Sequence, residues 1–454
     1  MDILNPATGA LIATLPVTTT EQTQQKYDTA RAAQPAWAAK PLSERLQAID
    51  KFYQLLADHA DMLAAVTTSE VGKPLGQSKG EINGARKRIK FFLDQSARYL
   101  ADEVAYEEEG LKEIIRYEPL GVIGNISAWN YPYLVGVNVF VPALIAGNAV
   151  LYKPSEHATL TGLKIRDLLY EAGVPQEVFQ VVVGAREAGE ALLNLPLDGY
   201  YFTGSFRTGQ YIYERVAPKM VPCQLELGGK DPLYVPNDVK DVNNVAVNAA
   251  EGAFYNNGQS CCAVERIYVH EGIYDEFVEA FLKETQSYKL GQPTEEGVFL
   301  GALTRKDQLT VLEGQVKDAK AKGAKLLLGG HRIDNGGYFF EPTVLTNVNH
   351  TMKVMTEESF GPIIGIQKVA NDEEAIALMQ DTEYGLTASV YSDSQERGEG
   401  ILKQINTGTA YWNCCDRVSP YLPWSGRKHS GIGATLSHIG IRAFTKPKGY
   451  HLRG

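Results

Sequence analysis

Apolar and polar positions alternate along the chain with the periods of both helices and strands. Between Glu21 and Leu100, apolar residues recur every three or four positions, as in LSERLQAIDKFYQLLADHADML, and this spacing predicts amphipathic helices. Farther on, EIIRYEPLGVIGNISAW predicts strands, VPALIAG a helix, and NAVLYKPS a strand that ends in a loop. TGLKIRDLLYEAG with FQVVVG predicts another helix–strand pair, and QLTVLEGQVKDAKAKGAKLLLGG predicts a helix leading into a strand. This alternation predicts an α/β fold, with a largely parallel sheet and helices on both of its faces.

The longest uncharged stretch, LVGVNVFVPALIAGNAVLY, runs from Leu134 to Tyr152 and has nearly membrane-spanning length. It contains a proline, two asparagines and two glycines, so we expect a buried helix, a turn and a strand instead. The N-terminal segment lacks a basic region followed by an apolar core and a cleavage site. We therefore expect no signal peptide and a cytoplasmic location.

Composition narrows the class of protein. The 454 residues suit two or three domains, and 44% hydrophobic with 22% charged residues is typical of a soluble globular protein. A net charge of −10 argues against nucleic acid or an anionic membrane as the main partner, because both need clustered positive charge. Local basic residues can still bind an anionic cofactor.

The cysteines raise the first question about chemistry. They are Cys223, Cys261, Cys262, Cys414 and Cys415. An odd number arranged in two adjacent pairs is untypical of a disulfide framework, so we expect reduced thiols. None of the spacings matches a zinc site, and we expect no metal. In NNGQSCCAVER, either adjacent thiol could be a nucleophile, or both could simply fill the core.

Two strand ends carry groups suited to a cofactor. In YYFTGSFRTG, an apolar strand runs into Gly204 and Ser205 and then into a helix whose free N–H groups suit a pyrophosphate. An ordinary strand–turn–helix joint is the alternative, and the fingerprint G-x-G-x-x-G is absent. In YKPSE, Glu156 after Lys153 could accept hydrogen bonds from a ribose diol and repel a 2′-phosphate. The alternative there is a solvated loop.

Two further motifs carry groups suited to catalysis. Glu226 in ELGGKDP precedes two glycines that permit close approach of the backbone, and apolar neighbours would raise its pKa toward that of a general base. An exposed acid in a turn is the alternative. Asn130 in SAWNYPY offers an amide donor for an oxyanion, although asparagine before Tyr-Pro is also ordinary turn chemistry.

Seven motifs occur in order along the chain: AWNYP, KPSE, FTGS, ELGGKDP, NNGQSCCA, EESFGP and SGRKHSGIG. Together they resemble the signatures of the NAD(P)-dependent aldehyde dehydrogenase superfamily, and the resemblance extends from NPATG to the terminal strand. It implies a Rossmann-type NAD(P)-binding domain over 1–97 and 119–227, and an α/β catalytic domain over 228–433. It also implies a small β oligomerisation segment made from 98–118 and 434–454.

The resemblance assigns the chemistry to three residues. The family's nucleophile is the cysteine two positions after the glutamine of G-Q-x-C, which is Cys261 here. Its thiolate attacks the aldehyde carbon, and the Asn130 amide with the Cys261 backbone N–H holds the oxyanion. Hydride passes to the nicotinamide, and Glu226 then activates the water that hydrolyses the acyl-thioester. Cys262 is left as a neighbour, which oxidation could join to Cys261 in a strained disulfide.

The same resemblance implies the cofactor contacts, which are Trp129, Lys153, Glu156, Gly204, Ser205, Glu358 and Phe360. Lys153 and Glu156 match contacts to the adenosine ribose, and Glu358 matches the carboxylate that grips the nicotinamide ribose. We expect NAD, with NADP as the alternative because relatives that use NADP also carry KPSE.

Aromatic and apolar residues occupy positions that line the substrate tunnel in relatives: Tyr133, Val135, Tyr411, Trp412 and Trp424. Such a lining suits a medium-chain aliphatic or aromatic aldehyde, although packing explains any one of them equally well. Arg417 could attract an acidic tail, with an ordinary surface arginine as the alternative.

The chain departs from the family pattern at several positions. A lysine that many relatives have nine residues after the catalytic asparagine is Val139 here, so a proton relay would need water or another group. Succinate-semialdehyde enzymes commonly have an arginine one position earlier, and Asn138 in its place argues against a short dicarboxylic semialdehyde. The typical PFGG loop is PWSG, Pro423 to Gly426.

The leading functional hypothesis is a hydrolytic aldehyde dehydrogenase that works as a homodimer or homotetramer, in which the terminal strand extends a partner's sheet. A CoA-acylating aldehyde dehydrogenase is the alternative enzyme, but such enzymes generally lack the general-base glutamate. A catalytically silent structural relative is the alternative from another class. Loss of the nucleophile or the base would mark that case, and both are present.

Overall fold

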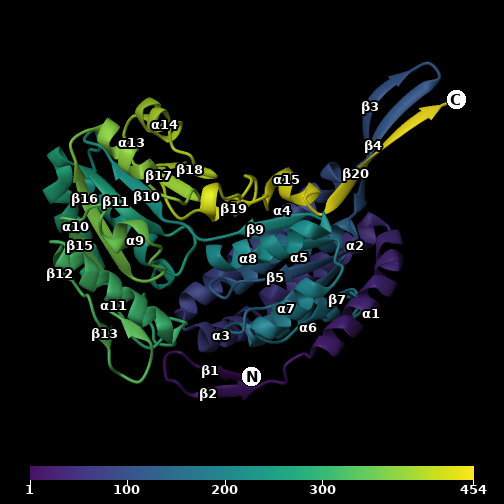
Figure 1. The fold of residues 1–454 in the computed structure, drawn as a ribbon, viewed down its shortest axis with the longest axis horizontal. Coiled ribbons are helices and arrows are strands. Elements are labelled where there is room, and N and C mark those ends of the chain that lie inside the picture. Colours follow the sequence, from purple (N-terminus) through teal and green to yellow (C-terminus); the bar gives the residue numbers. More distant parts are fainter.

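The computed structural model describes the whole chain, residues 1–454. Figure 1 shows two bodies of sheet and helices side by side, with a narrow β-arm extending from one of them. The two bodies contain sheets of six and seven strands, and the arm contains three strands. The predicted α/β fold is confirmed, but the strands divide between two large sheets, which the alternation of helix and strand could not reveal.

Four consecutive helices precede the first large sheet. They are α1 (Thr20–Ala39), α2 (Leu42–Asp58), α3 (Ala60–Val71) and α4 (Leu75–Tyr99). Together they cover the stretch for which helical periodicity predicted helices. Helix α4 packs against both α2 and α5 (Pro132–Ala146), so its inner face is buried against another helix rather than exposed to solvent.

A six-stranded sheet forms the centre of the first body. Its order is β19-β9-β8-β5-β6-β7, and only β19, at one edge, runs antiparallel to its neighbour. The strands are β5 (Val122–Ile126), β6 (Ala149–Lys153), β7 (Phe179–Val181), β8 (Gly199–Thr203), β9 (Cys223–Glu226) and β19 (Gly431–Ile432). Besides α5, the connecting helices are α6 (Thr159–Glu171), α7 (Arg186–Asn194) and α8 (Phe206–Val216).

The uncharged stretch from Leu134 to Tyr152 forms the predicted helix, turn and strand. Helix α5 ends at Ala146, Gly147 takes a φ of +101°, and β6 follows. The left-handed conformation ends the helix, and glycine adopts it without strain. No helix of the structure is both long and apolar enough to cross a membrane.

A seven-stranded sheet forms the centre of the second body. Its order is β12-β15-β16-β11-β10-β17-β18, and every pairing except that of β12 is parallel. The strands are β10 (Asp231–Val235), β11 (Val264–His270), β12 (Lys325–Leu328), β15 (Thr343–Thr346), β16 (Ile363–Val369), β17 (Thr387–Val390) and β18 (Thr409–Trp412). The helices are α9 (Val242–Phe254), α10 (Tyr274–Ser287), α11 (Lys306–Ala321), α12 (Lys353–Thr356), α13 (Asp372–Gln380) and α14 (Gln395–Leu402).

The arm is an antiparallel sheet with the order β20-β4-β3. It consists of β3 (Glu103–Glu108), β4 (Leu111–Pro119) and β20 (Thr445–Arg453), and it stands out from the rest of the molecule (Figure 1). Two segments far apart in the sequence therefore pair with each other here. The short remaining elements are β1 (Asp2–Leu4), β2 (Leu11–Thr14), β13 (Arg332–Ile333), β14 (Phe339–Phe340) and α15 (Ser437–Arg442).

The chain passes between the two large sheets near one place. Strand β9 ends at Glu226 in the first sheet and β10 begins at Asp231 in the second, so that residues 227–230 connect them. After β18 the chain returns to the first sheet at β19. The carboxyl ends of parallel strands are where open α/β sheets bind ligands, and this junction joins the carboxyl end of β9 in the first sheet to the amino end of β10 in the second.

Candidate active site

The loop after α9 has a backbone that only a few residue types adopt readily. Asn256, Asn257 and Gly258 have φ values of 53°, 57° and 68°, and Cys261 follows three residues later. Asparagine and glycine tolerate this left-handed region far better than other residues. The sequence Asn-Asn-Gly therefore forms a sharp turn after α9, and the cysteines that follow it lie at the junction.

Buried side chains hold this loop in place. The Asn257 amide donates to the Ala302 carbonyl at 2.9 Å and accepts from the Gly301 N–H at 2.9 Å. The Gln259 side chain accepts from the Thr304 N–H at 3.0 Å. Because amides that are buried and paired in this way do not reorient freely, the loop has a fixed position.

The two adjacent thiols lie in different surroundings. Cys261 is half-buried and lines a cavity of about 420 Å³, whereas Cys262 is only 4% exposed. The Cys262 thiol donates to Asp416 Oδ1 at 3.0 Å. Its hydrogen bond with the Cys261 sulfur, together with burial and the Asp416 charge, raises the pKa of Cys262 well above its usual range. Both thiols therefore border the cavity, but Cys262 is held as a neutral, buried thiol, and Cys261 is the more exposed of the two.

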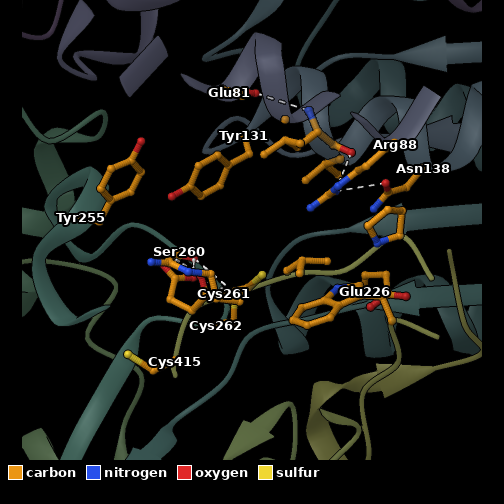
Figure 2. A pocket seen from close by; sticks show the side chains of 18 of the residues that line it. Glu81, Arg88, Tyr131, Asn138, Glu226, Tyr255, Ser260, Cys261, Cys262 and Cys415 are labelled. Atoms are coloured by element: carbon orange, nitrogen blue, oxygen red, sulfur yellow. Dashed lines mark hydrogen bonds between the residues drawn. The ribbon is translucent and has the colours of Figure 1, made fainter. Parts of the chain in front are cut away.

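Glu226, at the end of β9, lines the same cavity as Cys261 (Figure 2). Its Oε1 accepts from Gln224 Nε2 at 3.3 Å and from Thr435 Oγ1 at 3.4 Å, while its Oε2 is buried without a partner. Burial raises the pKa of Glu226 to about 8. A carboxyl group with a raised pKa and a free oxygen is suited to accept a proton from water.

Asn130 lies against the cysteine loop. Its side-chain amide donates to the Gln259 carbonyl at 3.0 Å, and its own carbonyl accepts from Asn256 Nδ2 at 3.2 Å. The residue is buried behind the loop and is not among the residues that line the cavity. A primary amide has two N–H donors, so one remains for a second acceptor beside the loop.

The structure divides the residues predicted for the substrate pocket. Val135, Arg417 and Trp424 line the cavity, and Tyr133, Tyr411 and Trp412 do not. The lining positions on α5 follow helical spacing and are 134, 135, 138 and 139, and Tyr131, just before the helix, also lines the cavity. Tyr133 lies on the opposite side of the helix and is fully buried in the core, so its predicted place in the pocket was wrong.

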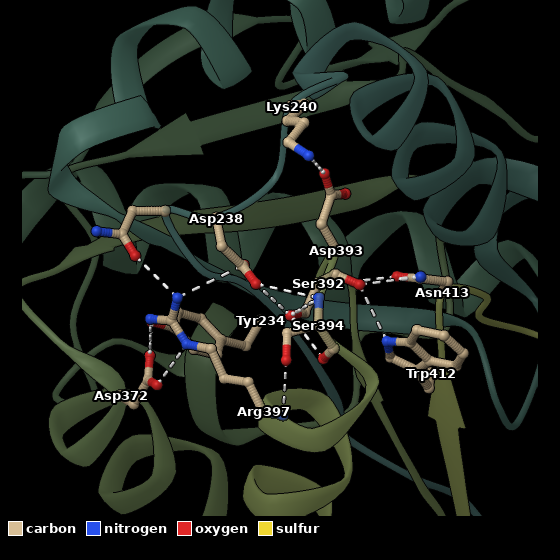
Figure 3. Close-up of polar contacts among 11 residues, drawn as sticks. Tyr234, Asp238, Lys240, Asp372, Ser392, Asp393, Ser394, Arg397, Trp412 and Asn413 are labelled. Carbon is tan, nitrogen blue, oxygen red and sulfur yellow. Dashed lines mark hydrogen bonds and ion pairs between the residues drawn. The ribbon is translucent and has the colours of Figure 1, made fainter.

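Trp412 was also wrongly predicted to line the pocket. It is 36% exposed, and its indole N–H donates to the Ser392 carbonyl at 3.0 Å, beside α14 (Figure 3). Alternation along β18 sends consecutive side chains to opposite faces, so Tyr411 is buried while Trp412 points to the other face. The hydroxyl of Tyr411 donates to the Arg417 carbonyl and thereby braces the segment that closes one side of the cavity.

Sequence reasoning missed several charged residues of the cavity. Arg88 of α4, Glu81 of the same helix, Glu251 of α9 and Asp416 all line it. Glu81 forms a buried ion pair with Lys73. The helical period marked these positions as one face of α4, but it could not show that α5 leaves a cavity there. The lining is accordingly more polar than the aromatic and apolar lining that the sequence predicted.

A second group of predicted residues gathers beside β6 and the loop before α5. Lys153 is buried at the end of β6, and its Nζ lies 3.9 Å from the Glu156 carboxylate. Although burial opposes it, the charge of Lys153 holds the pKa of Glu156 below its ordinary value. The Trp129 ring meets the Phe360 ring edge-on, with centroids 5.5 Å apart. The Trp129 ring also meets the His157 ring edge-on, with centroids 6.3 Å apart, so the two aromatic rings lie next to the segment that carries Lys153 and Glu156.

Glu358 lies directly over the two glycines that follow Glu226. Its carboxylate accepts from the Gly229 N–H at 3.0 Å, and a Cβ added to Gly228 would lie 2.2 Å from its oxygen. Glycine at position 228 is therefore required for this close approach. Burial and the charge of Glu265 raise the pKa of Glu358 to about 8.

The turn at Gly204 and Ser205 leads from β8 into α8, as predicted. The Ser205 side chain does not cap the helix, because its hydroxyl donates to Thr208 Oγ1 at 3.1 Å instead. The first N–H groups of α8 are left for an external acceptor, which fits the phosphates of a dinucleotide. Together with Lys153 and Glu156 at the end of β6, these residues fit NAD(P). No group of three or more His, Cys, Asp or Glu side chains is arranged to hold a metal.

Comparisons with known proteins agree with this arrangement. The sequence pattern of the aldehyde dehydrogenase family matches residues 1–449. A putative NADP(+) succinate-semialdehyde dehydrogenase of Mycolicibacterium smegmatis is 36% identical over 448 residues, which cover 97% of this chain and 86% of the relative. A chloroplastic aminoaldehyde dehydrogenase of Arabidopsis thaliana is 35% identical over 458 residues, which cover 98% and 91%.

Solved structures give the same result. A gamma-glutamyl-gamma-aminobutyraldehyde dehydrogenase from Burkholderia cenocepacia has a TM-score of 0.96 at 32% identity and covers 100% of this chain and 93% of that chain. An indole-3-acetaldehyde dehydrogenase of P. syringae, solved with NAD+, has a TM-score of 0.97 at 30% identity, with the same coverage. The matching sequence pattern, the relatives and the shared fold together show that the chain belongs to the aldehyde dehydrogenase family, the NAD(P)-dependent oxidoreductases of aldehydes.

Proposed function

We propose that the protein oxidises its aldehyde through a covalent bond to Cys261 and releases the carboxylic acid by hydrolysis. The observation that carries the proposal is the pairing of two groups in one cavity. Cys261 offers a half-buried thiol, and Glu226 offers a carboxyl oxygen that no other group binds. A nucleophile and a base on the same cavity are the minimum for acyl transfer to water.

The residues act in sequence. The Cys261 sulfur attacks the aldehyde carbon, and the carbonyl oxygen becomes an oxyanion. The Asn130 amide and the Cys261 backbone N–H are proposed to donate to this oxyanion, and the hydrogen bonds that hold Asn130 against the cysteine loop support this role.

Bound NAD(P)+ supplies the hydride acceptor. Trp129, Phe360 and Glu358 are proposed to hold its nicotinamide end, and the turn at Gly204 and Ser205 its pyrophosphate. Lys153 and Glu156 are proposed to bind the adenosine ribose. The negative charge of Glu156 favours NAD, because it would repel the additional 2′-phosphate of NADP.

Glu226 is proposed to act after oxidation, when an acyl-thioester remains on Cys261. Its carboxylate takes a proton from water in the cavity, and the resulting hydroxide equivalent hydrolyses the thioester. A base in this place supports water rather than CoA as the final acceptor.

The names of relatives leave the substrate open. One acts on a semialdehyde with a carboxylate and another on aldehydes with an amine, so these relatives differ in the charge at the far end. We further propose a cytoplasmic enzyme that works as a homodimer or homotetramer through the arm.

The experiment that tests the function compares the two adjacent cysteines. We expect Cys261→Ala to lower turnover by roughly 10³-fold or more, because the covalent route is lost. Cys262→Ala serves as the matched control and should keep most of the activity. The measurement is the absorbance of reduced nicotinamide with NAD or NADP and a panel of aldehydes, with and without CoA. Equal loss in two folded variants would contradict the assignment, and dependence on CoA would contradict hydrolysis.

A further inference from the structure

Arg88 differs from the other buried arginines in its unused hydrogen-bond donors. Arg266 uses Nε, Nη1 and Nη2, and Arg45 uses Nε and Nη1. Arg88 uses Nη1 alone, which donates to the Leu134 carbonyl and to Asn138 Oδ1, both at 3.0 Å. Its Nε and Nη2 donate to no protein atom.

The unused nitrogens of Arg88 face the cavity. Neither Nε nor Nη2 is fully buried, and Arg88 lines the cavity together with Cys261. Figure 2 shows Arg88 and Asn138 on one side of this cavity, with Cys261 and Glu226 on the facing side. The guanidinium is therefore directed toward the space that a substrate held on Cys261 occupies.

No protein carboxylate neutralises this cation. Arg88 forms no ion pair, and Glu81 on the same helix is already paired with Lys73 and accepts from the Tyr133 N–H. Glu226 shares the cavity but has a pKa of about 8, so it is mostly protonated at neutral pH. An unpaired buried charge is costly, and a substrate that supplies the counter-charge is favoured for the same reason.

The other acidic groups of the cavity are less suited to bind a substrate cation. The Asp416 carboxylate accepts from the Ser260 hydroxyl and from the Cys262 thiol. Glu251 is half-buried, and the exposed cations Lys87 and Arg417 line the same cavity. The buried charge without a counter-ion is therefore positive.

We propose that Arg88 binds an acidic group at the far end of the substrate, so that the preferred substrates are aldehydes that also carry a carboxylate. The proposal rests on the proposed function of Cys261. Asn138 by itself argues against a short dicarboxylic semialdehyde, because the arginine of other enzymes is missing there. In the structure the Asn138 amide holds the Arg88 guanidinium instead, and the cation enters the cavity from α4.

A carboxylate matches the free side of the guanidinium. Nε and Nη2 lie on one edge of the planar group, and this pair binds the two oxygens of a carboxylate in parallel. Because Asn138 and the Leu134 carbonyl already fix Nη1, little side-chain freedom is lost on binding. Neutral aldehydes of the same length would leave the guanidinium unpaired.

The test compares glutaric semialdehyde with pentanal and with the aminoaldehyde of the same chain length. We expect the wild type to prefer the semialdehyde, and we expect Arg88→Met to reduce the ratio of kcat/KM for semialdehyde over pentanal by roughly 100-fold, mainly through KM. Arg88→Lys keeps the positive charge but lacks the paired N–H donors of the guanidinium, so its ratio should lie between those of Arg88→Met and the wild type. Arg86→Met, on the same helix but bonded to the Tyr53 carbonyl, is the matched control and should leave the ratio unchanged.

Each outcome decides the matter. A wild type that prefers pentanal or the aminoaldehyde overturns the proposal. A loss of kcat by the same factor for all substrates in Arg88→Met also overturns it, since Arg88 would then act on the thiolate. Glutarate should inhibit pentanal oxidation competitively in the wild type, which tests the site without any variant, and failure to do so counts against it. Failure of the wild type to oxidise any aldehyde overturns the proposed function itself, which is a distinguishable result.

Discussion

At the scale of single residues, the environment of each group separates roles that the amino-acid type leaves open. Cys261 and Cys262 are the same residue type and both border the cavity, yet Cys261 is half-buried, whereas Cys262 is buried and donates a hydrogen bond to Asp416. Glu226 and Glu358 lie on either side of the same two glycines, and burial raises the pKa of each to about 8. Burial at the junction therefore raises the pKa values of both carboxyl groups, so that both are mostly protonated at neutral pH.

The raised pKa of Glu226 predicts a pH dependence. The group holds its proton at neutral pH, and only the carboxylate accepts a proton from water. We therefore expect thioester hydrolysis to accelerate as pH rises, with a midpoint at about 8. In Glu226→Gln this step should slow by roughly 10²–10⁴-fold, leaving a rapid first turnover of reduced nicotinamide followed by slow turnover.

Single-turnover and steady-state kinetics across the pH range check this prediction. Glu70→Gln is the matched control, because Glu70 is also buried and has a pKa of about 7, but it lies at the N-terminus of α6, away from the cavity. Its removal should leave the midpoint in place. A variant of Glu226 that loses the first turnover as well would show that the residue acts before the thioester forms.

The sequence was informative about residues whose chemistry needs a fixed local pattern. Certain residue types are needed at the Asn-Asn-Gly turn, at the glycines after Glu226 and at the Gly204 turn because of the local backbone. Such needs can be recognised from the sequence alone. Arg88 could not be recognised, because its role depends on the Asn138 amide fifty positions away in the sequence. Trp412 was misplaced because an aromatic residue in a strand can face either side of the sheet.

At the scale of elements, a buried ion pair connects the start of β10 to β11 and fixes the loop that carries Glu358. Lys230 Nζ lies 2.6 Å from Glu265 Oε2 and donates to Ser359 Oγ at 3.0 Å. Glu265 also accepts from the backbone N–H groups of Ser359 and Phe360. The nicotinamide side of the proposed cofactor cleft therefore depends on one buried pair.

We expect Lys230→Met to lower the free energy of unfolding by about 3 kcal/mol, because it leaves the Glu265 charge buried and only partly compensated. The KM for NAD should rise in the same variant, since the loop with Glu358 loses an anchor. Urea unfolding and steady-state kinetics measure the two effects. A variant with wild-type stability would contradict this account of the pair.

Lys240→Met provides the comparison for this variant. Lys240 pairs with Asp393 at 3.8 Å on the surface, at the edge of the polar network around Arg397 (Figure 3). Exposed pairs contribute little because water screens them and long side chains lose freedom in forming them. We expect no measurable change in unfolding or kinetics, so that a difference between the two lysines reports burial alone.

Helical and strand periodicity predicted most elements of the fold, including the helix, turn and strand between Leu134 and Tyr152. It did not predict that the strands form two sheets, because strand pairing is a long-range property. The cavity lining depends on the same long-range packing of α4, α5 and α9 around the cysteine loop. The sequence therefore identified the motif residues more reliably than the residues that contact the substrate.

At the scale of the whole molecule, the arm is the part of the chain with the least support from the rest of the fold. Every residue of β3 is exposed, and the apolar side chains of Val104, Tyr106 and Leu452 are 51%, 48% and 48% exposed. The two outer strands, β3 and β20, each have one edge without a partner. Unpaired edges and exposed apolar side chains together favour association with another chain.

We therefore expect the arm to hold the proposed oligomer together. Val104→Lys combined with Tyr106→Lys should shift the protein toward the monomer, because the added charges would be buried in the interface. In an isolated chain such exposed positions tolerate substitution with little change in stability. Leu11→Lys, at a residue of β2 that is 59% exposed, is the matched control and should leave the assembly unchanged. Light scattering after size-exclusion chromatography gives the mass of each variant, and a wild type that is already monomeric, or an arm variant with unchanged mass, would refute this role for the arm.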